Sequence, residues 1–100
     1  MAREMDSVMM KAVQDGHIGK VQTLLDDGVD INLKDRVGRT AVIIAAFKPD
    51  MLELLLNAGA DPNIGDRVGR TALIIASMNS RIDIVRLLLD KDADINIQDE

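Results

Sequence analysis

The side chains that could carry out acid–base, nucleophilic or metal chemistry are few in this chain of 100 residues. His17 is the single histidine and there is no cysteine, so a zinc site or a histidine-based catalytic pair has too few ligands. Ser7, Ser77 and Ser80 have no histidine base placed beside them by any motif, and no glycine-rich phosphate loop occurs. We therefore expect no enzyme activity, no cofactor and no bound metal.

One acidic segment has a spacing that could suit calcium. Its oxygen-bearing residues alternate as in the opening of a calcium-binding loop: Asp90, Asp92, Asp94 and Asn96. However, Ile95 stands where such a loop needs glycine. Asp61 and Asn63 occupy the same places in an earlier copy of this segment, so we interpret the pattern as a structural turn.

Composition narrows the classes of partner. The formal net charge is -5 and only 1% of residues are aromatic, which disfavours binding to nucleic acid through phosphates or stacked bases. The first residues, M-A-R-E-M-D, lack a secretory pattern, and apolar stretches such as Ala41 to Phe47 are too short to span a bilayer. We expect an intracellular, cytoplasmic protein, with the nucleus as an alternative, and no membrane contact.

The elements that would position any functional residue come from an internal repeat. D-R-V-G-R-T-A occurs at 35–41 and again at 66–72, 31 residues later. A leucine-rich segment that closes on Asn occurs three times, ending at Asn32, Asn63 and Asn96. The last two are 33 residues apart and the first two only 31, so the middle copy lacks two residues. Landmark spacings place this deletion between the two helices of the middle copy, where Lys48-Pro49 replaces a longer segment.

Local signals predict where helices begin. Thr40 and Thr71 are expected to cap a first helix, because a threonine hydroxyl can accept a backbone N–H of the first turn. Pro49 suits the first position of a second helix. In the last copy, Ser80 and Asp83 match a capping box and predict the corresponding start at Ser80.

Other residues predict the ends of helices and the turns between them. Gly28 and Gly59 are expected to stop the second helices, whereas Asp92 takes the equivalent place in the third copy. The segments 35–38 and 66–69 have Asp first and Gly fourth, as a type I turn prefers, and should form hairpin-like fingers. The second helices carry apolar residues on a face meant for burial: Leu52, Leu55, Leu56, Ile84, Val85, Leu88 and Leu89.

The frame D-x-x-G-x-T-x-L…A…L-L-L-x-x-G-A-D-x-N resembles the ankyrin repeat, a turn and two helices with a period of about 33 residues. The resemblance covers residues 7 to 98 and implies an all-α ankyrin-repeat solenoid of stacked helix-turn-helix units with hairpin-like finger loops. We expect a single domain over 1–100, with repeats at about 5–34, 35–65 and 66–98. The family's T-P-L-H is replaced by T-A-V-I and T-A-L-I, and we expect Ile43 and Ile74 to compensate by packing.

The resemblance also implies a function: a noncatalytic module that binds a protein partner through its finger tips and inner helical face. On the fingers it assigns Arg36, Val37, Arg39, Arg67, Val68 and Arg70 to partner binding. On the adjoining helical surface it assigns Phe47, Lys48, Met78 and Asn79, beside Gln14 and Asp15. His17 falls in a turn between helices.

Two details of this surface stay open at the level of sequence. The paired arginines of the two fingers could form a basic ladder for an acidic partner, or each could pair with its neighbouring Asp35 or Asp66. Identical fingers could also reflect duplication alone. Phe47 could be a binding anchor or could fill the space left by the shortened loop.

The alternative function is structural. Asp99 and Glu100 would begin a fourth repeat, so the third helix pair lacks a neighbour and could be covered by a second copy of the chain. Exchange of elements between chains would also give a dimer, and the chain could instead be a fragment of a larger regulatory protein.

Overall fold

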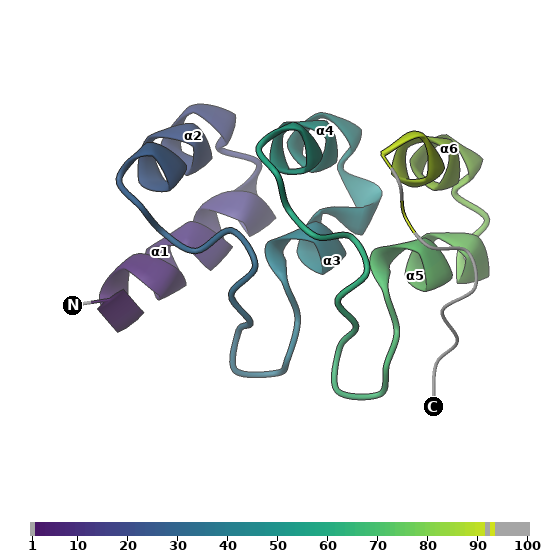
Figure 1. The fold of residues 1–100 in the computed structure, drawn as a ribbon, viewed down its shortest axis with the longest axis horizontal. Coiled ribbons are helices and arrows are strands. Elements are labelled where there is room, and N and C mark those ends of the chain that lie inside the picture. Colours follow the sequence, from purple (N-terminus) through teal and green to yellow (C-terminus); the bar gives the residue numbers. More distant parts are fainter. Residues whose placement is uncertain (1, 92, 94–100) are drawn as a thin grey trace.

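The computed structural model describes residues 2–91 and residue 93. These residues form six α-helices and one 3-10 helix: α1 (Ala2–Asp15), α2 (Ile18–Asp26), α3 (Ala41–Ile44), η1 (Ala45–Phe47), α4 (Pro49–Asn57), α5 (Ala72–Met78) and α6 (Ile82–Asp90). Figure 1 shows three helix hairpins side by side, with α1, α3 and α5 in an inner row and α2, α4 and α6 in an outer row. The first finger (residues 34–40) and the second finger (residues 65–71) project beyond the inner row. The predicted all-α stack with finger loops is confirmed.

The two threonine caps are confirmed. Thr40 Oγ1 accepts the backbone N–H of Ile43, and Thr71 Oγ1 accepts that of Ile74, each at 3.3 Å. Both threonines are buried, so loss of either hydroxyl would remove the acceptor of an N–H group at the start of an inner helix. The caps fix the point at which each finger turns into an inner helix.

The predicted capping box at Ser80 is wrong. Helix α6 begins at Ile82, its N-cap is Arg81, and no side chain caps it. Ser80 has a φ of 58° and instead closes the end of α5, since its N–H donates to the carbonyl of Ser77. Gly16, with a φ of 76°, takes the same place between α1 and α2. The left-handed backbone ends one helix before the next can start, which moves the start beyond the S-x-x-D pattern.

The shortened middle repeat loses this left-handed residue. Its inner helix is only four residues long and tightens into η1, and the N–H of Lys48 then donates to the carbonyl of Ala45. Pro49 follows as the first residue of α4, as predicted. The two missing residues therefore convert a helix–turn–helix link into a continuous tight turn.

Glycine ends the outer helices, as predicted. Gly28 has a φ of 97° and Gly59 a φ of 96°, the left-handed conformation that closes a helix without a steric cost in glycine. The predicted stop at Asp92 lies outside the described residues, as do Asp94 to Glu100 and with them most of the calcium-like pattern.

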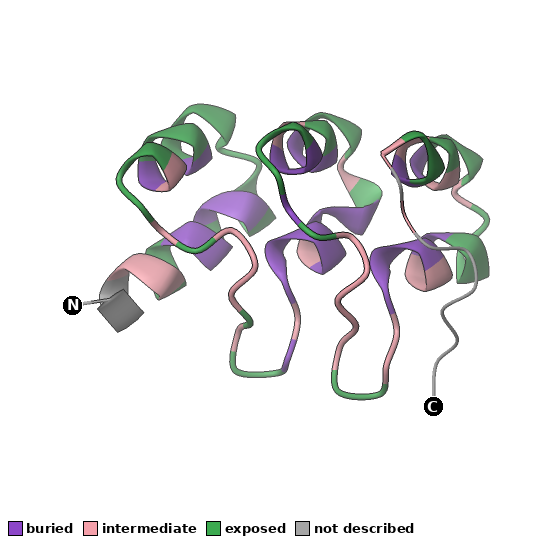
Figure 2. Cartoon of the chain, in the orientation of Figure 1, coloured by how far each residue is buried: buried purple, intermediate pink, exposed green. Residues whose placement is uncertain are grey.

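The core lies between the two rows of helices and is aliphatic (Figure 2). Its largest fully buried apolar side chains are Met9, Val13, Val21, Val42, Met51, Leu52, Leu55, Ile84 and Leu88. Buried alanines, among them Ala45 and Ala76, let the inner helices approach closely because their side chains take little room. Ile43 is buried in the core, so the predicted packing at the start of the inner helix is confirmed in the middle repeat, whereas Ile74 is half-buried.

The face predicted for burial on the outer helices is complete in α4 and only partial in α6. Leu56 and Leu89 occupy equivalent positions, yet Leu56 is 8% exposed and Leu89 39%. Helix α4 has α6 packed beside it, whereas no described helix follows α6. Among the described residues, no helix is both long and apolar enough to cross a bilayer.

Candidate functional site

The first finger is closed by its own aspartate. The N–H of Gly38 donates to the carbonyl of Asp35 at 3.1 Å, which forms the predicted turn, and the N–H of Asp35 donates to the carbonyl of Arg39 at 2.8 Å. Oδ1 of Asp35 accepts the N–H groups of Val37 at 3.0 Å and Arg39 at 2.8 Å. One carboxylate therefore holds both sides of the turn, which makes the finger a defined scaffold.

The second finger repeats this geometry. The N–H of Gly69 donates to the carbonyl of Asp66 at 3.0 Å. Oδ1 of Asp66 accepts the N–H groups of Val68 at 3.0 Å and Arg70 at 2.9 Å. The shared sequence thus closes both turns with the same set of hydrogen bonds, because residues of the motif itself contribute them.

Both finger aspartates have a pKa below the ordinary value of 3.8. Burial by itself raises the pKa of Asp35, but hydrogen bonds from the backbone and side chain of Arg39 and the charge of that guanidinium outweigh it. At Asp66, burial is likewise outweighed by the backbone N–H groups of Arg70 and Val68 and by the charge of Arg70. Both carboxylates are therefore charged at neutral pH.

The structure divides the predicted arginine ladder. Arg39 Nη2 lies 3.0 Å from Asp35 Oδ2, and Arg70 Nε lies 3.3 Å from Asp66 Oδ2, so these two arginines pair within their own fingers. Arg67 crosses to the first finger, where its guanidinium donates to the backbone carbonyl of Arg36. Within the described part of the chain, only the Arg36 guanidinium of the four has no protein acceptor.

The tips and inner helix ends expose apolar side chains. Val37 and Val68 stand at the tips, and Met78, at the end of α5, is 63% exposed. Phe47 is 44% exposed, and the Arg81 guanidinium lies 5.8 Å from its ring centroid, within cation–π range. Phe47 therefore contacts Arg81 while a large part of its side chain stays exposed to solvent.

The remaining predicted residues take less prominent places. Lys48 is half-buried and precedes α4, and the side chain of Asn79 donates to the carbonyl of Ile75 at 2.8 Å, which occupies its amide at the end of α5. Oδ2 of Asp15 lies 3.7 Å from Nζ of Lys11, and the two side chains form an ion pair. His17 sits in the turn between α1 and α2, as predicted.

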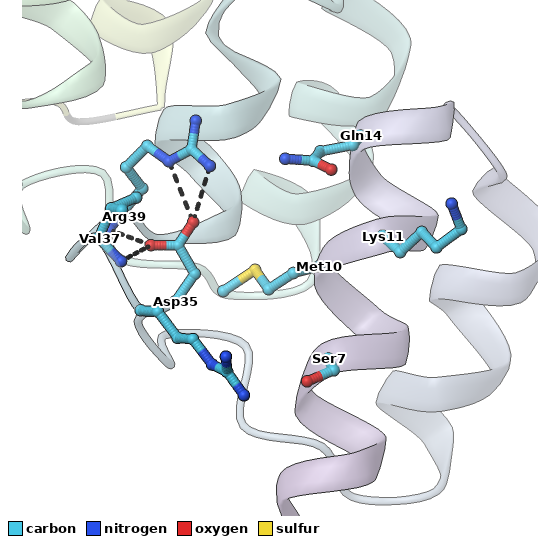
Figure 3. Close-up of a pocket in the computed structure, with 8 residues that line it drawn as sticks. Ser7, Met10, Lys11, Gln14, Asp35, Val37 and Arg39 are labelled. Atoms are coloured by element: carbon cyan, nitrogen blue, oxygen red, sulfur yellow. Dashed lines mark hydrogen bonds and ion pairs between the residues drawn. The ribbon is translucent and has the colours of Figure 1, made fainter.

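Several cavities open beside these residues, and two of them share Gln14 and Arg39 as lining residues. One of about 370 Å³ lies between α1 and the first finger, and Figure 3 shows Ser7, Met10 and Gln14 of α1 facing Asp35 and Arg39 across it. Another of about 350 Å³ is lined mainly by Ile43, Ile44, Phe47 and Ile75. Ser7 and Met10 were not predicted as lining residues, because the sequence gives no sign of how far α1 extends beside the finger.

Metal-binding geometry is absent from residues 2–91 and 93, which bring no three His, Cys, Asp or Glu side chains together around a possible ion. What the described surface does offer is two rigid fingers, exposed apolar side chains and shallow cavities. These features can hold another molecule.

Comparisons with known proteins agree with this geometry. A family model described as ankyrin repeats, in three copies, matches residues 9–99. A search among curated proteins found no match. Ankyrin repeats generally serve as protein–protein interaction modules and are typically noncatalytic. With the match spanning most of the chain and three helix hairpins stacked behind paired fingers, the chain belongs to the ankyrin-repeat family.

Proposed function

We propose that this chain is a noncatalytic module that binds a protein partner through its finger tips and inner helical face. One observation carries the proposal: four exposed large apolar side chains, Val37, Val68, Phe47 and Met78, lie on the tips and the ends of the inner helices. Exposed apolar groups beside rigid polar turns are typical of interaction surfaces. The partner surface comprises Arg36, Val37, Arg39, Phe47, Lys48, Arg67, Val68, Arg70, Met78 and Asn79, and we place the protein in the cytoplasm.

The test compares two variants that change the net charge equally. Val37→Glu with Val68→Glu alters both tips, whereas Arg86→Glu alters an exposed residue of the outer helix α6. Partners captured by the wild-type chain are purified, and their Kd is measured by isothermal titration calorimetry. The tip variant should weaken binding by about tenfold or more, and Arg86→Glu by less than about twofold. Equal affinities for the tip variant and wild type would reject this surface.

A second candidate is self-association through the exposed face of α6. It is favoured by the exposure of Leu89 and of Ile82, which is 66% exposed at the start of the same helix. Sedimentation equilibrium over a wide concentration range tests it. A mass that rises with concentration, and that Leu89→Lys returns to the monomer value, would support a dimer; a constant monomer mass would eliminate it.

A further inference from the structure

The two cavities of the inner side adjoin each other. Gln14 and Arg39 line both the cavity beside the first finger and the cavity against the middle repeat. We call the combined feature the inner groove. Its finger end is lined by Asp35, Arg36 and Arg39, and its opposite end is lined mainly by aliphatic and aromatic side chains, with Lys48 beside them.

The finger end of the inner groove has cationic donors in excess. Arg36 lines it, and its guanidinium has no acceptor among the described residues. Asp35 takes the Nε and Nη2 donors of Arg39, and since a guanidinium carries five N–H groups, about three donors of Arg39 are left over. Arg36 and Arg39 together carry two positive charges against the single carboxylate of Asp35 in the same cavity, so this end can receive a further carboxylate.

The opposite end is apolar and accessible. Ile44 and Ile75 are half-buried, and the exposed part of the Phe47 side chain adjoins them, so these side chains present unpaired apolar surface to water. Its volume of about 350 Å³ suits one large side chain of a partner. Covering this surface removes it from water, which favours binding.

We propose that the inner groove binds a short extended segment that carries one carboxylate and one large apolar side chain. The carboxylate pairs with Arg36 and Arg39, and the apolar side chain rests on Ile44, Phe47 and Ile75. This inference rests on the proposed interaction function and gives it a specific ligand chemistry. The second finger differs because Arg67 donates to the Arg36 carbonyl, so among the described residues only the first finger has an arginine whose guanidinium has no acceptor.

Synthetic peptides of about eight residues provide the probe. Each has a glycine–serine background with one leucine and one glutamate, separated by one to three residues, and matched peptides carry Leu with Gln or Ala with Glu. Affinities are measured by NMR titration of the isotope-labelled chain. At one spacing, the Leu–Glu peptide should bind about fivefold or more tightly than both matched peptides and should shift the amide signals of Arg36 and Ile44. Equal affinities across the three peptides would overturn the proposal.

Variants of the chain locate the two halves of the groove. Arg36→Glu should abolish the preference for Glu over Gln, while Arg86→Glu, the same charge change on an outer helix, should preserve it. Gln14→Trp should fill the junction of the two cavities and lower affinity for the Leu–Glu peptide, whereas Gln14→Ala should not. Circular dichroism melts check folding, and Arg36→Ala, which removes charge without reversing it, gives the same test if Arg36→Glu unfolds. Equal losses in Arg36→Glu and Arg86→Glu would refute the site.

The two proposals fail in different ways. If a captured partner binds through the finger tips but none of the Leu–Glu peptides binds or competes with it, the groove proposal is wrong and the interaction proposal stands. If no partner is captured, the interaction proposal fails as stated, while preferential peptide binding that Arg36→Glu abolishes still supports the groove chemistry.

Discussion

At the scale of single residues, the four arginines of the two identical finger motifs differ in the contacts that they make. Arg39 and Arg70 are held by Asp35 and Asp66, four residues earlier in their own fingers. Arg67 reaches the neighbouring finger, and the Arg36 guanidinium has no acceptor among the described residues. In each finger the sequence places two arginines close to one aspartate, and it does not show which of the two pairs with that aspartate. The choice depends on the closed turn, which brings position 39 or 70 back beside the carboxylate.

The finger carboxylates predict an acid-dependent loss of stability. Their folded pKa lies below 3.8, so they stabilise the fold above about pH 4, and this contribution is lost as pH falls through the lower folded pKa. Asp35→Asn with Asp66→Asn should lower the free energy of unfolding by roughly 1–2 kcal/mol at about pH 7 and make it less sensitive to acid near pH 3. Urea denaturation at both pH values checks this.

The matched control is Asp26→Asn, which replaces an exposed carboxylate of α2. It should change the free energy of unfolding by less than about 0.5 kcal/mol at neutral pH and leave the acid dependence as in wild type. If the double variant showed the same slope between the two pH values as this control, the fingers would make no acid-sensitive contribution.

At the scale of elements, the parts predicted correctly depend on one residue type at one local position. Thr40 caps a helix, Pro49 begins one and Gly59 ends one, each through its own local chemistry. The sequence alone therefore predicts these three positions. The prediction that a helix starts at Ser80 is wrong, because a capping box and a left-handed turn can contain the same residues. The cavities could not be predicted at all, since they depend on how α1 lies beside a finger far along the chain.

Ser80 provides a stability prediction for the turn between α5 and α6. Its left-handed backbone is costly for a residue with a Cβ atom, so Ser80→Gly should stabilise the chain by up to about 1 kcal/mol. Ser77→Gly, inside α5 and exposed, should instead destabilise it by about 0.5–1 kcal/mol. Thermal denaturation of both variants measures the difference, and a destabilised Ser80→Gly would contradict the assigned conformation.

At the scale of the whole molecule, burial is produced by stacking of neighbouring helix pairs. A position on one pair is covered only when the next pair packs against it, as Leu56 and Leu89 show. The repeat in the sequence predicts this architecture well, because each pair has an apolar face too large to bury alone. It does not reveal how completely the last described pair is covered.

Equivalent leucines should therefore differ in their contribution to stability. Leu56→Ala removes a side chain that is 8% exposed and should cost about 2–3 kcal/mol, whereas Leu89→Ala should cost less than about 1 kcal/mol. Urea denaturation of the two variants under identical conditions gives the comparison. Equal losses would mean that Leu89 is covered in solution, and a repeat of the measurement at several protein concentrations would show whether a second copy covers it.

The Arg67 side chain lies across Gly38, where an added Cβ atom would stand 2.6 Å from its Cγ, and ends on the Arg36 carbonyl. The Arg67 side chain therefore links the two finger tips, so a displacement of one tip would disturb its contact with the other. In a library that varies the finger loops to obtain new binding specificities, Gly38 and Arg67 should therefore be kept together and the two loops varied as one unit.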